Sequence, residues 1–230
     1  MVHLVTGYAG RAHIKSEDDG AFNASFVGSD QYVMEFGNCF EATIIDNNTV
    51  RLSDGNGMMY GRYFRIEPNA HEDVTIDNGT SGKNRIDLIC AVYRKNTSTG
   101  VETLTLDVIK GTETTGTATT PKYTNGDILQ GATLNQMPLY KVKINGVVLK
   151  EVIPMFKKVQ TFKKMAEKYE AEFQEEIEKL KSENILDSLD AIKSNTEQNK
   201  IAGATALKEL VNKMEELENY IGSDLLGGAS

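Results

Sequence analysis

Glycine and proline are absent from one long stretch of this chain, and this absence constrains the fold more than any other feature. All four prolines and 16 of the 20 glycines precede residue 157, whereas neither residue type occurs from Lys157 to Ala202. Both residue types mark turns and interrupt helices, so a stretch that lacks them favours a long helix. The 230 residues are enough for one medium domain with an extension. We therefore predict two parts, an all-β domain over residues 1–156 and a helical part after it.

Alternating runs predict β-strands in the first part. Apolar and polar residues alternate over Gln31–Phe36, Thr49–Leu52 and Asp73–Asp77. A period of two places one face of each strand on a core and the other face in water. The expected fold of residues 1–156 is an antiparallel β-domain, either a sandwich or a barrel.

Two hairpins are predicted within this domain. In one, the apolar runs Arg85–Tyr93 and Val101–Ile109 flank a short polar loop. In the other, Asn145-Gly146 joins Leu139–Ile144 to Val147–Ile153. Asparagine and glycine both tolerate positive φ, so this dipeptide predicts a type I′ turn.

The second part has the residue spacing of a coiled coil. Apolar residues recur at intervals of three and four, the a/d pattern of a left-handed supercoil. Residues 157–193 as one helix would form a rod of about 55 Å. After a polar interruption at 194–199, the spacing resumes at 207–221. The residues expected to be buried between helices are Val159, Phe162, Ala166, Tyr169, Phe173, Ile177, Leu180, Leu189, Ile192, Leu207, Leu210, Met214, Leu217 and Ile221.

An apolar seam this narrow needs a second helix. Either residues 157–193 fold back on residues 203–221, or several copies of the chain associate. We favour association, because the seam begins directly after the β-domain. The bulky Phe162, Tyr169 and Phe173 fit three helices better than two. The overall prediction is a homotrimer with an all-β domain (1–156), a long coiled coil (157–193) and a C-terminal part (194–230) with a polar loop, a short helix and a tail.

Charge and composition exclude several classes of protein. The net charge is −8, with 25 basic and 33 acidic residues, whereas nucleic-acid binding depends on cationic side chains. No apolar stretch approaches the ~20 residues that span a bilayer, and we expect no signal peptide and no membrane insertion. Cys39 and Cys90 are expected to be reduced and buried, although a disulfide bond between them is an alternative.

No catalytic or metal-binding constellation is evident, so we expect neither an enzyme nor a cofactor. His3, His13 and His71 belong to no metal or hydrolase motif. Residues 17–20, Glu-Asp-Asp-Gly, form an acidic turn whose carboxylates could bind Ca²⁺, but the ligand spacing of an EF-hand is absent. Residues 54–57, Asp-Gly-Asn-Gly, are expected to form a tight hairpin.

Several ordered motifs in the first part resemble one known family. The motifs are Val5–Arg11, Glu17–Asn23, Asn48–Arg51, Asp54–Arg62, Asp73–Thr80, Asn84–Ile89, Val108–Thr112 and Pro138–Val142. They look like the N-terminal domain of baseplate and tail-fibre proteins from phages and prophages of Gram-positive bacteria. In addition, Asn195–Leu210 is similar to a linker of phage fibres that leads into a short trimeric helix.

The resemblance implies a structural role in a phage tail or a tail-like bacteriocin, without enzymatic activity. Its implied partners are two further copies of the chain, other baseplate proteins and a distal receptor-binding protein. Its implied location is the virion, after synthesis in the bacterial cytoplasm. We expect no counterpart of the family's distal head in this sequence, because only residues 222–230 follow the linker and its helix. As an alternative, the β-domain itself binds a cell-surface glycan, with trimerisation raising its avidity.

Overall fold

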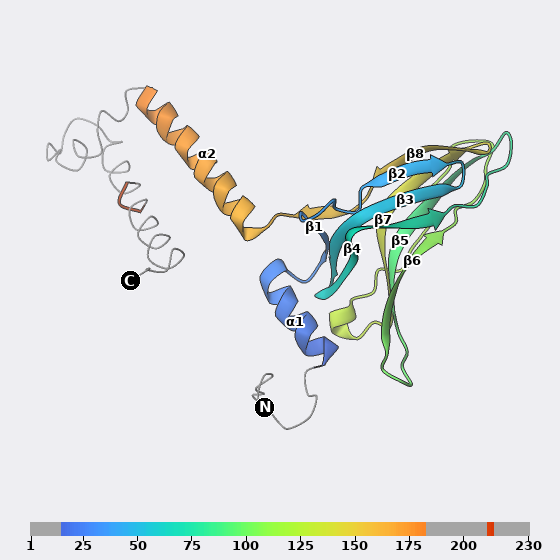
Figure 1. The fold of residues 1–230 in the computed structure, drawn as a ribbon, viewed down its shortest axis with the longest axis horizontal. Helices are drawn as coiled ribbons and strands as arrows, with labels where there is room; N and C mark the ends of the chain where they lie inside the picture. The colour runs from blue at the N-terminus through green and yellow to red at the C-terminus, as the bar shows by residue number, and fades with distance from the viewer. Residues whose placement is uncertain (1–14, 183–210, 214–230) are drawn as a thin grey trace, which may run out of the picture. The chain divides into compact units, whose positions relative to one another are not determined.

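The computed structural model describes residues 15–182 and 211–213 and divides into two compact units, Met1–Phe162 and Lys163–Ser230. Strands dominate the first unit (Figure 1). Its elements are α1 (Ser16–Val27), β1 (Gln31–Met34), β2 (Ala42–Asp46), β3 (Thr49–Met59), β4 (Arg62–Thr75), β5 (Asn84–Lys95), β6 (Glu102–Ile109), the 3₁₀ turn η1 (Ile128–Gln130), β7 (Leu134–Asn145), β8 (Val148–Pro154) and β9 (Lys157–Val159). Helix α2 (Phe162–Ser182) begins at the end of this unit.

The strands form two sheets. In the first, β4 pairs along one side of β3, while β2 and β1 pair along its other side. In the second, the order is β6-β5-β7-β8, with every pair antiparallel. Strands β4 and β6 lie next to each other at one side of the unit, and β2 and β8 do so at the other. The sheets therefore form a sandwich, with β4 and β6 as edge strands on the same side.

Strand β9 is the exception to antiparallel pairing. Its residues Lys157–Val159 pair in parallel with Tyr32–Met34 of β1. The amide of Glu35 also donates a hydrogen bond of 2.8 Å to the carbonyl of Val159. This pairing ties the end of the first unit to its first strand.

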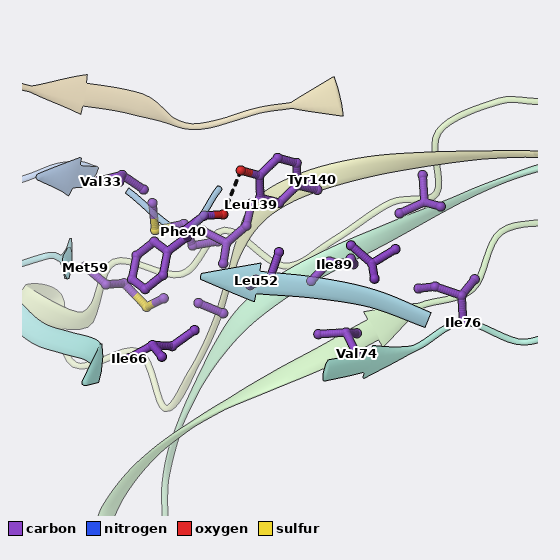
Figure 2. Close-up of a cluster of buried hydrophobic side chains, with 14 of the residues drawn as sticks. Val33, Phe40, Leu52, Met59, Ile66, Val74, Ile76, Ile89, Leu139 and Tyr140 are labelled. Carbon is purple, nitrogen blue, oxygen red and sulfur yellow. Dashed lines mark hydrogen bonds between the residues drawn. The ribbon is translucent and has the colours of Figure 1, made fainter. Parts of the chain in front are cut away.

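The core lies between the two sheets (Figure 2). Leu52 and Val74 from the first sheet meet Ile89 and Leu139 from the second, and Leu52, Ile89 and Leu139 are completely buried. The hydroxyl of Tyr140 donates a 2.8 Å hydrogen bond to the carbonyl of Phe40, the dashed line in Figure 2. The alternation seen in the sequence explains the positions of Leu52 and Val74, because every second residue of such a strand faces inward. Strand β5 differs, since Leu88, Cys90 and Val92 form a second buried cluster.

Both predicted hairpins are present. Strand β5 pairs with β6 from Leu88–Ile109 to Lys95–Glu102, and β7 pairs with β8. The second turn is displaced by one position, since Asn145 pairs with Val148 and leaves Gly146 and Val147 as the turn residues. Gly146 has a φ of 59°, the positive value that the turn requires.

A buried ion pair fastens the strand β5 to its surroundings. The side chains of Arg85 and Asp87 are 1% and 0% exposed, and Nε of Arg85 lies 2.8 Å from Oδ1 of Asp87. The same guanidinium donates to the carbonyls of Asp77 and Asn78. Asp87 also accepts a 2.9 Å hydrogen bond from the amide of Gly111. Three chain segments thus meet at one salt bridge. The ion pair and its additional hydrogen bonds together offset the cost of burying the two charges.

The acidic stretch at residues 17–20 is not a turn, as the sequence analysis expected, but the start of α1. Carboxylates stabilise the first turn of a helix because the unpaired amides there carry partial positive charge. Asp18 accepts a 3.2 Å hydrogen bond from the amide of Lys15, which is the cap of the helix. The helix ends at Val27, and Gly28 follows with a φ of 89°.

The expected long coiled coil is wrong for the residues that the structure describes. Lys157–Val159, predicted as the start of the helix, form a strand because β1 offers them an edge. Helix α2 covers 21 residues, about 32 Å, in place of the expected rod of about 55 Å. Ion pairs join neighbouring turns of this helix, such as Lys163–Glu167 and Lys168–Glu172. Residues 183–193 and most of 194–230 lie outside the described part of the chain.

Candidate binding cleft

A cleft of about 760 Å³ opens between the edge strands β4 and β6. The volume falls within the range of roughly 300–1,000 Å³ that is usual for ligand sites. Strand β4 forms one wall and β6 the other, and Phe40 comes from the turn before β2. The lining residues are Phe40, Phe64, Arg65, Ile66, Glu72, Asp73, Val74, Thr75, Leu104, Thr105, Leu106, Asp107 and Val108.

Two stacked aromatic rings lie at one part of this cleft. The rings of Phe40 and Phe64 are nearly parallel, with centroids 5.7 Å apart. Both rings lie against glycines of β3. A Cβ on Gly57 would come within 2.2 Å of the Phe64 ring, and a Cβ on Gly55 within 2.7 Å of the Phe40 ring. The absence of side chains at these two positions therefore makes room for the rings.

The Asp-Gly-Asn-Gly stretch at residues 54–57 is thus not the hairpin that the sequence analysis expected. It lies inside β3, and the turn comes after it, at Tyr60 and Gly61. A glycine within a strand weakens it unless another group fills the space. Here the rings of Phe40 and Phe64 fill that space.

The inward-facing residues of β6 are apolar and incompletely covered. Leu104, Leu106 and Val108 alternate along β6 and pack against the core, yet each is only half-buried. On the facing strand, Ile66 and Val74 are buried, with 9% and 7% exposed. The cleft therefore exposes inward-facing side chains of the sandwich itself.

The rim of the cleft is charged, with acids in excess. One cation, Arg65, and three acids, Glu72, Asp73 and Asp107, line it. Asp73 pairs with Arg51 at 2.7 Å, and Asp107 pairs with Arg94 at 2.6 Å. The hydrogen bond from Arg51 lowers the pKa of Asp73 from its usual value.

A separate ion pair joins the two edge strands at their first residues. Nε of Arg62 on β4 lies 3.0 Å from Oε2 of Glu102 on β6, and both side chains are mostly buried. Lys95 contacts Glu102 as well as Glu17 of α1. Burial raises the pKa of Glu102, but hydrogen bonds led by that of Arg62 outweigh it and lower the pKa to about 2. This cluster holds β4 and β6 together next to α1.

The other candidate residues from the sequence do not assemble into a site. Cys39 and Cys90 are both free thiols. Burial raises the pKa of Cys90 to about 12, so its thiol is unreactive at neutral pH. Within residues 15–182 and 211–213, no group of three or more His, Cys, Asp or Glu could hold a metal ion. His71 is exposed on β4, whereas His3 and His13 lie outside the described residues.

The expected oligomer interface is only partly described. Val159 is half-buried in β9, and Phe162 and Tyr169 of α2 are 65% and 62% exposed. Ala166 is also exposed, while Phe173 and Ile177 are partly exposed and Leu180 lies near the end of α2. An interface between copies on these residues stays a prediction. The remaining members of the set lie outside the described part of the chain: Leu189, Ile192, Leu207, Leu210, Met214, Leu217 and Ile221.

Comparison with known proteins found no family model and no curated protein that matches this chain. The helices in the described ranges are all too short or too polar to cross a membrane.

The sequence analysis missed the cleft. One signal was present, because Glu102–Val108 alternates polar and apolar residues as an edge strand with one inward face does. The sequence did not show that the facing strand would be β4, which pairs with β3 and not with β6.

Proposed function

We propose that this protein is a structural, non-enzymatic component of the tail or baseplate of a phage or a tail-like bacteriocin, and that its β-sandwich is the attachment module. One observation carries the proposal beyond the sequence resemblance. The motifs that resemble the family are separate in the sequence, but several of them contact one another in the fold. The resemblance therefore concerns the residues that build one folded unit.

The buried ion pair provides the clearest case. Arg85 and Asp87 belong to the motif at residues 84–89, and Arg85 donates to carbonyls of the motif at 73–80. Asp87 accepts from Gly111, in the motif at 108–112. In the same way, Arg51 of the motif at 48–51 binds Asp73.

The proposed partners follow from the same resemblance. They are other copies of the chain in a homotrimer, a baseplate protein that receives the sandwich, and a distal receptor-binding protein. The proposed location is the virion, after synthesis in the bacterial cytoplasm. Light scattering on the purified chain would test the trimer directly, since three copies of 25.4 kDa differ clearly from one.

Deletion variants would test the attachment role. Particles would be purified from cells in which the gene carries an epitope tag, and the tagged chain would be measured by quantitative mass spectrometry. We expect a variant without residues 16–159 to be missing from the particles. A matched variant without residues 223–230 should still be incorporated.

Two outcomes would contradict the proposal. If the full chain is absent from purified particles, the protein is not a tail component. If the variant without the sandwich is incorporated as well as the full chain, attachment lies elsewhere in the chain.

A further inference from the structure

The cleft between β4 and β6 is bordered on both sides by unpaired strand edges. In the part of the chain that the structure describes, β4 pairs only with β3, and β6 pairs only with β5. The backbone groups on the outer edge of such strands can pair with another extended chain. Two edges that face the same opening therefore form a place where an additional strand can bind.

The side chains beside these edges lack a covering layer. Leu104, Leu106 and Val108 face the interior of the sandwich but remain partly exposed. At the opposite side of the sandwich, the inward Leu149 of β8 is 6% exposed. An incoming strand with apolar residues at every second position would bury the β6 residues and continue their alternation.

The charged residues that line the cleft favour particular residue types in such a strand. The lining has one cation and three acids, Glu72, Asp73 and Asp107. Each aspartate has a single arginine partner and remains well exposed, with 41% and 37% of its side chain accessible. Lysine or arginine at the polar positions of an incoming strand would therefore be favoured.

We propose that this cleft binds an extended peptide segment of a partner protein, which adds as a β-strand along β4 or β6 and inserts alternate apolar residues between the sheets. The proposal deepens the attachment role and rests on it, since the partner is then the tail protein that receives the sandwich. Eight residues of β6 span about 26 Å at ~3.3 Å per residue, so the bound segment has about eight residues.

A peptide fits the cleft better than a glycan does. Sugar recognition uses exposed aromatic faces together with many polar groups. Here Phe40 is buried, Phe64 is half-buried, and the inward-facing side chains of β6 are aliphatic. Strand addition, in contrast, uses backbone pairing for affinity and pockets for alternate side chains for specificity.

A displayed library of random nine-residue peptides, panned on the full chain, tests the proposal. We expect enriched sequences to alternate apolar residues with polar residues that include lysine or arginine. The most enriched peptide would then be synthesised with a fluorescent label and its binding measured by anisotropy. Leu106→Glu should weaken this binding at least tenfold. The matched control Thr103→Glu adds the same charge on the exposed face of the same strand and should change binding less than twofold.

Methylated peptides separate strand addition from simple apolar contact. N-methylation of alternate amides should abolish binding when it affects the amides that face the strand edge, and should have little effect on the other set. This readout uses the unaltered protein, so it does not depend on the folding of a variant. The proposal would be overturned if the two sets of methylated peptides bind equally well. It would also be overturned if panning on the full chain enriches no peptides beyond those enriched on the Leu106→Glu variant.

Other occupants of the cleft would give different results. Binding to a glycan array that Leu106→Glu abolishes would assign the cleft to a sugar and overturn the proposal. A tenfold gain in peptide affinity after deletion of residues 1–14 would assign it to the chain's own first residues. If Leu106→Glu loses the peptide but enters particles normally, the inference fails while the attachment role stands. If the full chain is absent from particles, the attachment role itself fails.

Discussion

Replacing Gly57 by alanine should disturb the aromatic pair at the cleft, although the substitution adds only one methyl group. Gly57 lies on β3 opposite Phe64 on β4. The added Cβ would lie 2.2 Å from Cζ of Phe64. Carbon atoms in contact are usually ~3.5–4.0 Å apart, so the ring must move by more than about 1 Å. That shift separates it from the ring of Phe40, on which it stacks.

Two opposing contributions determine the net effect. Forcing an extra carbon into a filled space costs about 1–3 kcal/mol. Alanine in a strand is otherwise more favourable than glycine by roughly 0.5–1 kcal/mol, because glycine loses more conformational entropy on folding. The free energy of unfolding should therefore fall by about 1–2 kcal/mol. For a unit of this size, the melting temperature should drop by about 2–8 °C.

Urea denaturation of the full chain, followed by circular dichroism, would measure this change. Gly116→Ala is the matched control, because its Cβ would meet nothing closer than 3.8 Å and its φ is not positive. The control should change stability by less than about 0.5 kcal/mol. In a Phe64→Leu background, the cost of Gly57→Ala should shrink. Equal effects of the two glycine substitutions, or an unchanged cost without the Phe64 ring, would refute the reasoning.

Three further predictions concern buried polar groups. Asp87→Ala leaves the Arg85 guanidinium buried with Glu113 and two carbonyls, and should cost about 3 kcal/mol in urea denaturation. The double variant Arg85→Met, Asp87→Leu should recover much of that loss, and a larger loss in the double variant would contradict this account. The pKa of Glu102, about 2 in place of 4.5, implies stability that is present above about pH 5 and is lost as the pH falls towards 2. The loss amounts to at most about 3–4 kcal/mol, so Glu102→Gln should flatten the acid side of a plot of stability against pH, and an unchanged acid side would count against the ion pair with Arg62. Burial raises the pKa of Cys90 to about 12, so a thiol reagent at neutral pH should modify Cys39 first; modification of Cys90 at the same rate in the folded protein would contradict its burial.

Local pattern was enough to predict the strands that pair with their neighbours in sequence. The hairpins β5–β6 and β7–β8 need only an alternating run, a short loop and a second run, all visible in one stretch. The pairing of β1 with β9 could not be predicted in this way. Lys157–Val159 carries a helical pattern, and the open edge of a distant strand outweighs that local preference.

The stretches at residues 17–20 and 54–57 and the cleft show the same limit of prediction from local sequence. The Asp-Gly-Asn-Gly stretch has turn residues, but its glycines leave room for the rings of Phe40 and Phe64, which lie outside that stretch. The acidic stretch at 17–20 has the composition of a turn and also that of a helix start, and only the structure distinguishes them. The cleft depends on which strands end up at the sheet edges, and residue types alone do not determine that.

The pairing of β9 with β1 also sets an order for folding during synthesis. Val33 and its partner Lys158 are 125 positions apart, from the difference of their residue numbers. At roughly 5–20 residues per second, the ribosome needs about 6–25 s to produce β9 after β1 has been made. Throughout that interval β1 presents a free edge, at which another nascent chain could pair. A chain that stops at residue 156, where the composition changes, would keep this edge open permanently and is expected to aggregate more readily than one that continues through Val159.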